Sequence, residues 1–202
     1  NRTLADYQAA LVDKAVAELG GYENVYFEVC NEFGAPDVER WSAWQRHFAS
    51  RIDAATSRLV AVHAGGGYGD PTWGQLYWDE PSIDVLNFRF DFDATAQDIS
   101  NTLHDAQTRG RVLAVNESHS TASAGPGATD FYGDLDSETR YAWGLFLSGA
   151  HVGFYEDDSN RVGSAGWRAG AERLRVLREI GERTRFWELS PVDVAGTEYD
   201  LL

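Results

Sequence analysis

The chain has 202 residues, of which 43% are hydrophobic and 13% aromatic, and it carries a formal net charge of −15. This length and composition predict a globular protein with a sizeable core, so we expect one domain over residues 1–202. The acidic balance, without any cluster of Lys and Arg, excludes nucleic acid and an anionic membrane surface as partners. No run of about 18 apolar residues predicts a transmembrane helix, and no signal peptide is recognised.

Cysteine, methionine and metal-ligand patterns give little sign of special chemistry. Cys30 is the one cysteine, and its apolar surroundings in the sequence predict a buried structural thiol. There is no Met, so the chain as given is expected to be a processed or excised piece. The five His form no zinc pattern, and Asp91, Asp93, Asp157 and Asp158 lack the spacing of a calcium loop. We therefore expect no metal and no cofactor.

Helical and extended patterns alternate along the chain. Apolar residues at helical spacing from Leu4 to Leu19, followed by Gly20 and Gly21, predict the first helix. Short apolar runs predict strands near 25–30, 59–63, 84–88, 112–116 and 150–155. Such alternation predicts an α/β protein with a parallel sheet and crossover helices.

Four further helices are expected between and after these strands. Asp37 is positioned to cap the second helix, and Thr95 with Asp98 resembles a capping box for the third, which stops at Gly110. Ser137 opens the fourth helix. The second helix is expected to bury one stripe, formed by Trp41, Trp44, Phe48, Ile52 and Ala55. The last helix carries Ala171, Leu174 and Leu177.

Polar residues collect where each predicted strand ends. These residues are Asn31 and Glu32, His63, Asn87 and Arg89, Asn116 and Glu117, and Glu156. Because the carboxyl ends of parallel strands meet at one edge, we expect them on one rim. Twice an apolar run ends in Asn-Glu, and two carboxylates at strand ends are the minimum equipment for glycoside hydrolysis.

The stretch Tyr26-Phe27-Glu28-Val29-Cys30-Asn31-Glu32 resembles the strand-four signature of the (β/α)8-barrel retaining glycosidases, a clan that includes the cellulase-like family 5. In that clan an Asn-Glu pair at strand four carries the acid/base, and a Glu at strand seven is the nucleophile. The strand near 112 is the third after the strand near 25, so Glu117 matches the nucleophile. The resemblance implies a partial TIM barrel, strands four to eight with their helices, as a catalytic barrel domain or fragment over 1–202.

The resemblance also implies a mechanism, a substrate class and a partner. Glu117 would attack the anomeric carbon of a carbohydrate substrate, while Glu32 would protonate the leaving oxygen and then activate water. Asn31 would hydrogen-bond the sugar 2-hydroxyl. Since a full barrel has eight strands, a second chain or segment is expected to supply the missing ones.

Two histidines and two tryptophans can each be interpreted in more than one way. His63 and His119 could bind hydroxyls or tune a carboxylate, or they are ordinary hydrogen-bonded histidines. Trp73 and Trp78 could form a sugar platform or pack within their loop. Glu28 is expected to be a hydrogen-bonded residue inside the strand.

Asn87, Arg89 and Glu156 are substrate-binding candidates. Arg89 and Glu156 could instead pair with each other across the mouth of the barrel.

Three alternative functions remain open. They are an inactive or truncated carbohydrate-binding barrel, a transglycosylase with the same glutamates, and an inverting hydrolase. Carboxyl separation distinguishes inverting from retaining enzymes.

Overall fold

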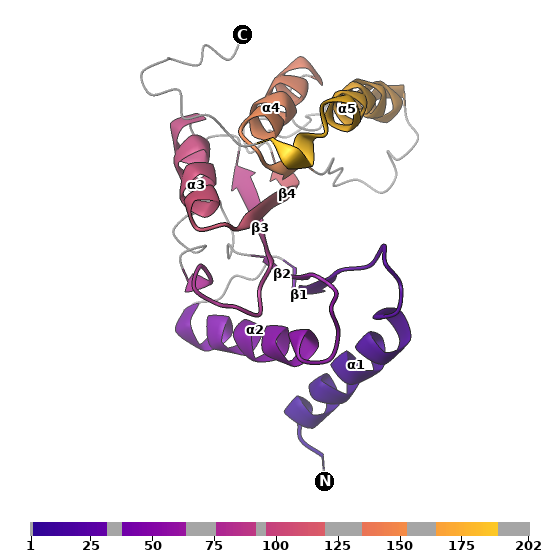
Figure 1. The fold of residues 1–202 in the computed structure, drawn as a ribbon, viewed down its shortest axis with the longest axis vertical. Coiled ribbons are helices and arrows are strands. Elements are labelled where there is room, and N and C mark those ends of the chain that lie inside the picture. The colour runs from indigo at the N-terminus through magenta and orange to yellow at the C-terminus, as the bar shows by residue number, and fades with distance from the viewer. Residues whose placement is uncertain are drawn as a thin grey trace, which may run out of the picture. The chain divides into compact units, whose positions relative to one another are not determined.

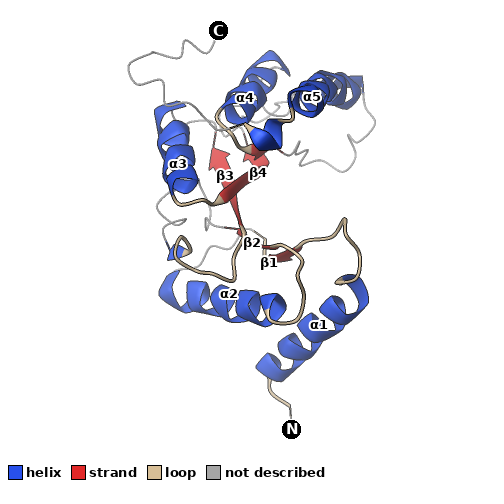
Figure 2. Cartoon of the chain, viewed as in Figure 1, coloured by secondary structure: helices blue, strands red, loops and turns tan. Residues whose placement is uncertain are grey.

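The computed structural model describes residues 2–31, 38–63, 76–91, 96–119, 135–152 and 165–189. Helices and strands alternate along these residues, except that no α-helix is described between β2 and β3 (Figures 1 and 2). The helices are α1 (Leu4–Leu19), α2 (Val38–Asp53), α3 (Ala96–Thr108), α4 (Leu135–Leu147) and α5 (Ala165–Thr184), with a 3-10 turn η2 (Phe186–Glu188). The strands are β1 (Phe27–Val29), β2 (Val60–His63), β3 (Val85–Asp91), β4 (Val112–His119) and β5 (His151–Val152).

The five described strands form one sheet in the sequential order β1-β2-β3-β4-β5. The pairs β1–β2, β2–β3 and β4–β5 are parallel. In the register, Glu28 lies beside Ala61, Ala61 lies beside Val85, and His63 lies beside Asn87. The predicted α/β class and five-stranded parallel sheet are therefore confirmed.

Contacts between residues divide the chain into two compact units. The first unit contains residues 1–89 and 105–113, and the second contains residues 90–104 and 114–202. In the first unit α2 packs on β1 and β2, and α1 packs on α2 (Figure 1). Apolar side chains of α2 and the strands form its core: Val29, Phe48, Ala49, Ile52, Val60, Val62, Leu86 and Phe88.

The buried face of α2 differs from the predicted stripe. Phe48 and Ile52 are buried as predicted, but Trp41 and Trp44 are only half-buried and Ala55 lies exposed beyond the helix end. The fully buried positions include Gln45. Hydrogen bonds at the end of β1 explain how this amide is accommodated, as described below.

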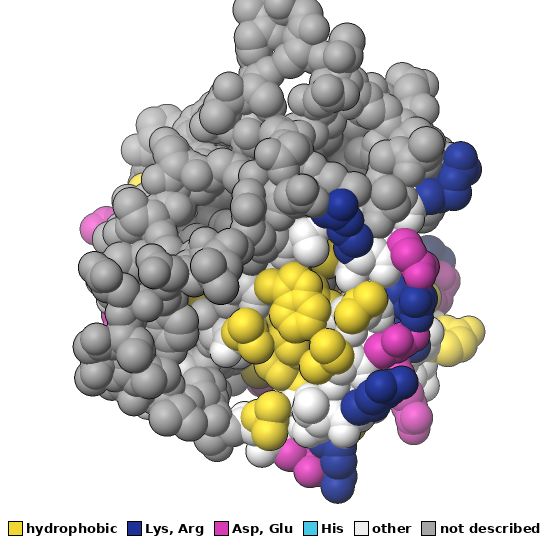
Figure 3. All heavy atoms as spheres, turned by 90° about the horizontal axis from the view of Figure 1, so that it is seen from above, with side chains coloured by type: hydrophobic (Ala, Val, Ile, Leu, Met, Phe, Trp, Pro, Cys, Tyr) yellow, Lys and Arg dark blue, Asp and Glu magenta, His cyan; other side chains and the backbone are white. Residues whose placement is uncertain are grey.

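In the second unit α4 packs against both α5 and β5. Phe146 of α4 stacks on Phe186 of η2, with ring centroids 4.3 Å apart and planes inclined by 19°. A Cβ on Gly181 would already touch the Phe146 ring, so this glycine allows the close approach. Hydrophobic side chains also gather beside acidic and basic ones on the face shown in Figure 3. Among the described residues of the second unit, the exposed large hydrophobic side chains are Leu147, Val176, Trp187 and Leu189.

Element boundaries follow the sequence signals closely in some places. Helix α1 spans the predicted residues, with Thr3 and Asp6 forming a capping box. After α3, Gly110 adopts a φ of 67°, the left-handed conformation that ends many helices at glycine. Other boundaries differ from the prediction: β1 is shorter than 25–30, α4 begins before Ser137, and β3 and β4 continue through polar residues to Asp91 and His119. A parallel ladder pairs backbone groups, so polar side chains do not by themselves end it.

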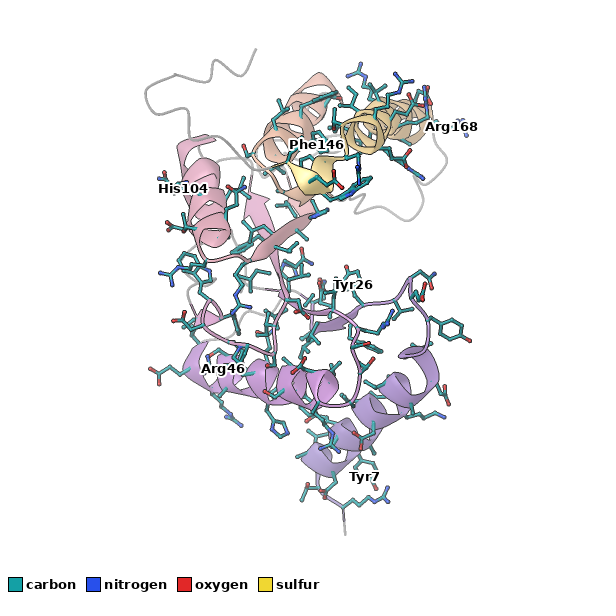
Figure 4. All side chains as sticks on the ribbon, viewed as in Figure 1. Tyr7, Tyr26, Arg46, His104, Phe146 and Arg168 are labelled. Atoms are coloured by element: carbon teal, nitrogen blue, oxygen red, sulfur yellow. The ribbon has the colours of Figure 1, made fainter. Side chains whose placement is uncertain are left out.

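The first unit exposes apolar side chains on α1 and in the segment before β1. Leu4, Tyr7 and Leu11 of α1 are exposed, and Tyr26 is exposed just before β1 (Tyr7 and Tyr26 are labelled in Figure 4). Among the described helices, none is long and apolar enough to cross a membrane.

Candidate functional site at the ends of β1, β2 and β3

The chain makes a sharp turn directly after β1. Cys30 has a φ of 68°, and this left-handed conformation costs a residue with a Cβ about 1–2 kcal/mol. The turn takes Cys30 out of the strand, so its side chain is exposed and the prediction of a buried thiol was wrong. Partial desolvation and then the charge of Glu28 raise the pKa of the Cys30 thiol. A raised pKa lowers the fraction of reactive thiolate near neutral pH.

Two buried polar side chains hold the backbone before this turn. Gln45 of α2 donates from Nε2 to the carbonyl oxygen of Val29 over 2.9 Å. Tyr77 in turn donates its hydroxyl hydrogen to Oε1 of Gln45. Burial raises the pKa of Tyr77 to about 12, so the phenol keeps the hydrogen that it donates. The end of β1 is thus anchored from α2 and from the segment before β3.

Sequence reasoning missed both of these anchoring residues. The available signal was Gln45 itself, a polar residue at helical spacing with the buried Phe48, Ala49 and Ile52. A buried amide needs partners, so its position predicts a hydrogen-bonded role. No local pattern, however, indicates that the partner is Tyr77.

The exposed Asn31 is tied to the buried His63 at the end of β2. Oδ1 of Asn31 lies 2.9 Å from Nδ1 of His63, whose side chain is only 1% exposed. An amide oxygen accepts hydrogen bonds and cannot donate them, so His63 Nδ1 carries the hydrogen. The bond therefore joins the carboxyl ends of β1 and β2 through side chains as well as through the backbone.

A second polar pair joins β1 to β3. Asn87 is 1% exposed and donates from Nδ2 to Oε2 of Glu28 over 2.6 Å. Side chains alternate between the faces of a strand, and the register places Glu28, His63 and Asn87 on the same face of the sheet. The prediction that Glu28 is a hydrogen-bonded residue within the strand is confirmed.

Trp78 lies near the amino ends of β3 and β4. Arg111, the residue before β4, donates hydrogen bonds to the carbonyl oxygens of Trp78 and Ile83, and Ile83 precedes β3. The guanidinium of Arg109 stands 4.3 Å above the Trp78 ring, which is 7% exposed. This arrangement matches the packing alternative and leaves no open ring face for a sugar.

The remaining predicted site residues carry no structural description of their side chains. Glu32, Trp73 and Glu156 lie outside the described residues. The backbone of Arg89 lies in β3, and those of Asn116, Glu117 and His119 lie in β4, but their side chains are outside the description. The roles assigned to these residues stay predictions.

No family model, curated protein or solved structure matches this chain. Within the part of the chain that the structure describes, no group of three or more His, Cys, Asp or Glu is arranged to hold a metal ion.

The described groups provide hydrogen-bonding chemistry rather than a complete reaction centre. Asn31 is exposed, and the described residues offer its Nδ2 no hydrogen-bond partner. Its oxygen is fixed by His63, so the amide is held in one orientation and its Nδ2 carries two N–H donors. Donors held in this way suit the oxygen of a ligand hydroxyl group.

Proposed function

We propose that the protein is a retaining glycoside hydrolase, with Glu32 as the acid/base and Glu117 as the nucleophile. The observation that carries the proposal is the position of the two Asn-Glu pairs. Asn31 follows the first strand of a sequentially ordered sheet, and Asn116-Glu117 lies near the end of the fourth. A separation of three strands supports the proposal, because strands four and seven carry the two glutamates in the glycosidases that the sequence resembles.

The strand order supports a (β/α)8 barrel as the complete architecture. In a doubly wound sheet the strand order reverses at a switch point, with helices on both faces. A sequential order with right-handed crossovers keeps all helices on one face, as a closed barrel requires. The order β1-β2-β3-β4-β5 fits the second pattern, so we assign these strands as strands four to eight.

The reaction then proceeds by two displacements on one sugar. Glu117 attacks the anomeric carbon as Glu32 gives its proton to the leaving oxygen, which forms a glycosyl-enzyme ester and releases the alcohol. Glu32, now a carboxylate, takes a proton from water as the water oxygen displaces Glu117. The bond made to Glu117 in the first step is broken in the second, so the configuration is retained.

The anchored amide supports the same assignment. Asn31 stands directly before Glu32, so a sugar hydroxyl bound by Asn31 would lie next to the proposed acid/base. Hydrogen bonds to the 2-hydroxyl that strengthen in the transition state contribute several kcal/mol in glycosidases. Such a contact gains from an amide whose orientation is fixed before substrate binds.

Covalent trapping tests the proposal. A preparation containing the complete barrel is incubated with 4-nitrophenyl glycosides of different sugars, and then with the 2-deoxy-2-fluoro analogue of any substrate that is turned over. We expect release of nitrophenol and a glycosyl adduct on the peptide that contains Glu117, detected by mass spectrometry. An adduct on another residue would remove Glu117 as the nucleophile. Sugar binding without turnover would favour the carbohydrate-binding alternative.

A further inference from the structure

We infer that His63 is a positioning residue that holds Asn31 as a hydrogen-bond donor toward the ligand and does not itself contact the ligand. The ring of His63 is only 1% exposed, and its Nδ1 bonds the amide oxygen of Asn31 over 2.9 Å. This assigns His63 an indirect role in place of direct hydroxyl binding, which was one of the roles that the sequence left open.

The direction of the hydrogen bond sets the chemistry of Asn31. A free asparagine amide can turn over and present either its oxygen or its nitrogen to a ligand. With Oδ1 engaged by the Nδ1–H of His63, Asn31 presents Nδ2. The site therefore favours a ligand atom that accepts a hydrogen bond, such as a hydroxyl oxygen, and disfavours a ligand that has no acceptor there.

The surroundings keep His63 in place. His63 is the last residue of β2, its neighbour in register is the buried Asn87, and the turn at Cys30 is anchored by Gln45. Both partners of the Asn31–His63 bond are thus fixed by separate elements of the first unit. Because the Asn31 side chain is already held in one orientation, it loses less conformational entropy when a ligand binds.

The first test does not depend on any enzymatic activity. NMR of the ¹⁵N-labelled full chain identifies which ring nitrogen of His63 carries hydrogen in the neutral state. We expect the hydrogen on Nδ1 in the natural sequence and a shift toward Nε2 in Asn31→Ala, a change at an exposed position. A ring protonated at Nε2 alone, or a tautomer ratio unaffected by Asn31→Ala, would overturn the inference.

The second test rests on the proposed function and compares two replacements of His63. His63→Asn places an amide N–H near the position of Nδ1, whereas His63→Leu is close in size but has no donor. We expect kcat/KM to fall about tenfold in His63→Leu and to be largely restored in His63→Asn, as the loss of one hydrogen bond implies. The same two changes at His104, an exposed residue of α3 (labelled in Figure 4), are the control and should leave kcat/KM unchanged.

A double-mutant cycle separates positioning from a general structural role. If His63 acts through Asn31, His63→Leu should cause no further loss of kcat/KM in the Asn31→Ala background. Additive losses, or a His63→Asn variant as impaired as His63→Leu, would overturn the inference. If no glycoside is hydrolysed, the proposed function fails, while the tautomer measurement still decides the Asn31–His63 relationship.

Discussion

Asn87 of β3 donates a hydrogen bond of 2.6 Å to the carboxylate of Glu28 in β1, although β2 lies between these two strands. The β2 residue in register with Glu28 is Ala61, whose side chain is small enough to leave room for the contact. Contacts between alternate strands are how side chains fill the interior of a parallel barrel. The pair therefore shows on which face of the sheet the polar residues of the site gather.

Removing Asn87 should destabilise the first unit. Asn87→Ala leaves a half-buried carboxylate without this donor, so we expect the free energy of unfolding to fall by about 1–3 kcal/mol. Urea denaturation measures the change. The control is Asn24→Ala at an exposed position before β1, which should shift the free energy by no more than about 0.5 kcal/mol. Equal effects of the two substitutions would mean that the Glu28–Asn87 bond contributes nothing.

The buried phenol of Tyr77 should make stability fall at high pH. Burial raises its pKa from 10.0 to about 12 in the folded chain, so the unfolded chain ionises first. The contribution of Tyr77 to the free energy of unfolding is fully present below about pH 10. It decreases by about 2–3 kcal/mol as the pH rises to about 12. Tyr77→Phe should lack this decrease, while Tyr22→Phe, at an exposed position, should keep it. Parallel stability curves for Tyr77→Phe and the natural sequence would contradict the assignment.

The left-handed residue after β1 predicts a stabilising substitution. Cys30 has a φ of 68°, a conformation that glycine adopts without steric cost. We expect Cys30→Gly to raise the free energy of unfolding by about 0.5–1 kcal/mol relative to Cys30→Ala, since both variants lack the thiol and only alanine keeps a Cβ. Thermal melting of the two variants makes the comparison. A less stable glycine variant would show that the turn is not strained.

The sequence predicts the order of elements better than it predicts the site. Apolar runs and glycine stops identify the five described strands and the bounds of α1, because local backbone preferences and burial act there together. Glu28 could be predicted as a hydrogen-bonded residue because a carboxylate within an apolar strand needs a donor.

Long-range partners and backbone turns could not be predicted in the same way. Nothing near Cys30 in the sequence indicates a positive φ, and the residue looked like part of the strand. Tyr77 meets Gln45 across 32 positions of sequence, and His63 meets Asn31 across the same separation. Trp78 resembled a sugar platform by residue type alone. In the structure Arg109 covers its ring and Arg111 donates hydrogen bonds to its carbonyl oxygen.

The two proposed catalytic glutamates should respond differently to substitution. Glu117→Gln should abolish turnover of every glycoside, because no glycosyl-enzyme can form without the nucleophile. Glu32→Ala should still allow the first step for aryl glycosides with good leaving groups, since these need no protonation. Its second step should stall because water is no longer activated.

Azide distinguishes these two roles. A small anion needs no general base, so it should restore turnover in Glu32→Ala and yield a glycosyl azide of retained configuration. The measurement follows phenol release from an activated aryl glycoside, with and without azide, in a preparation containing the complete barrel. Glu18→Gln and Glu18→Ala, at an exposed position of α1, are the matched controls and should match the natural chain. Rescue of Glu117→Gln with retained configuration would reverse the two roles, and full activity in either catalytic variant would exclude that glutamate from the reaction.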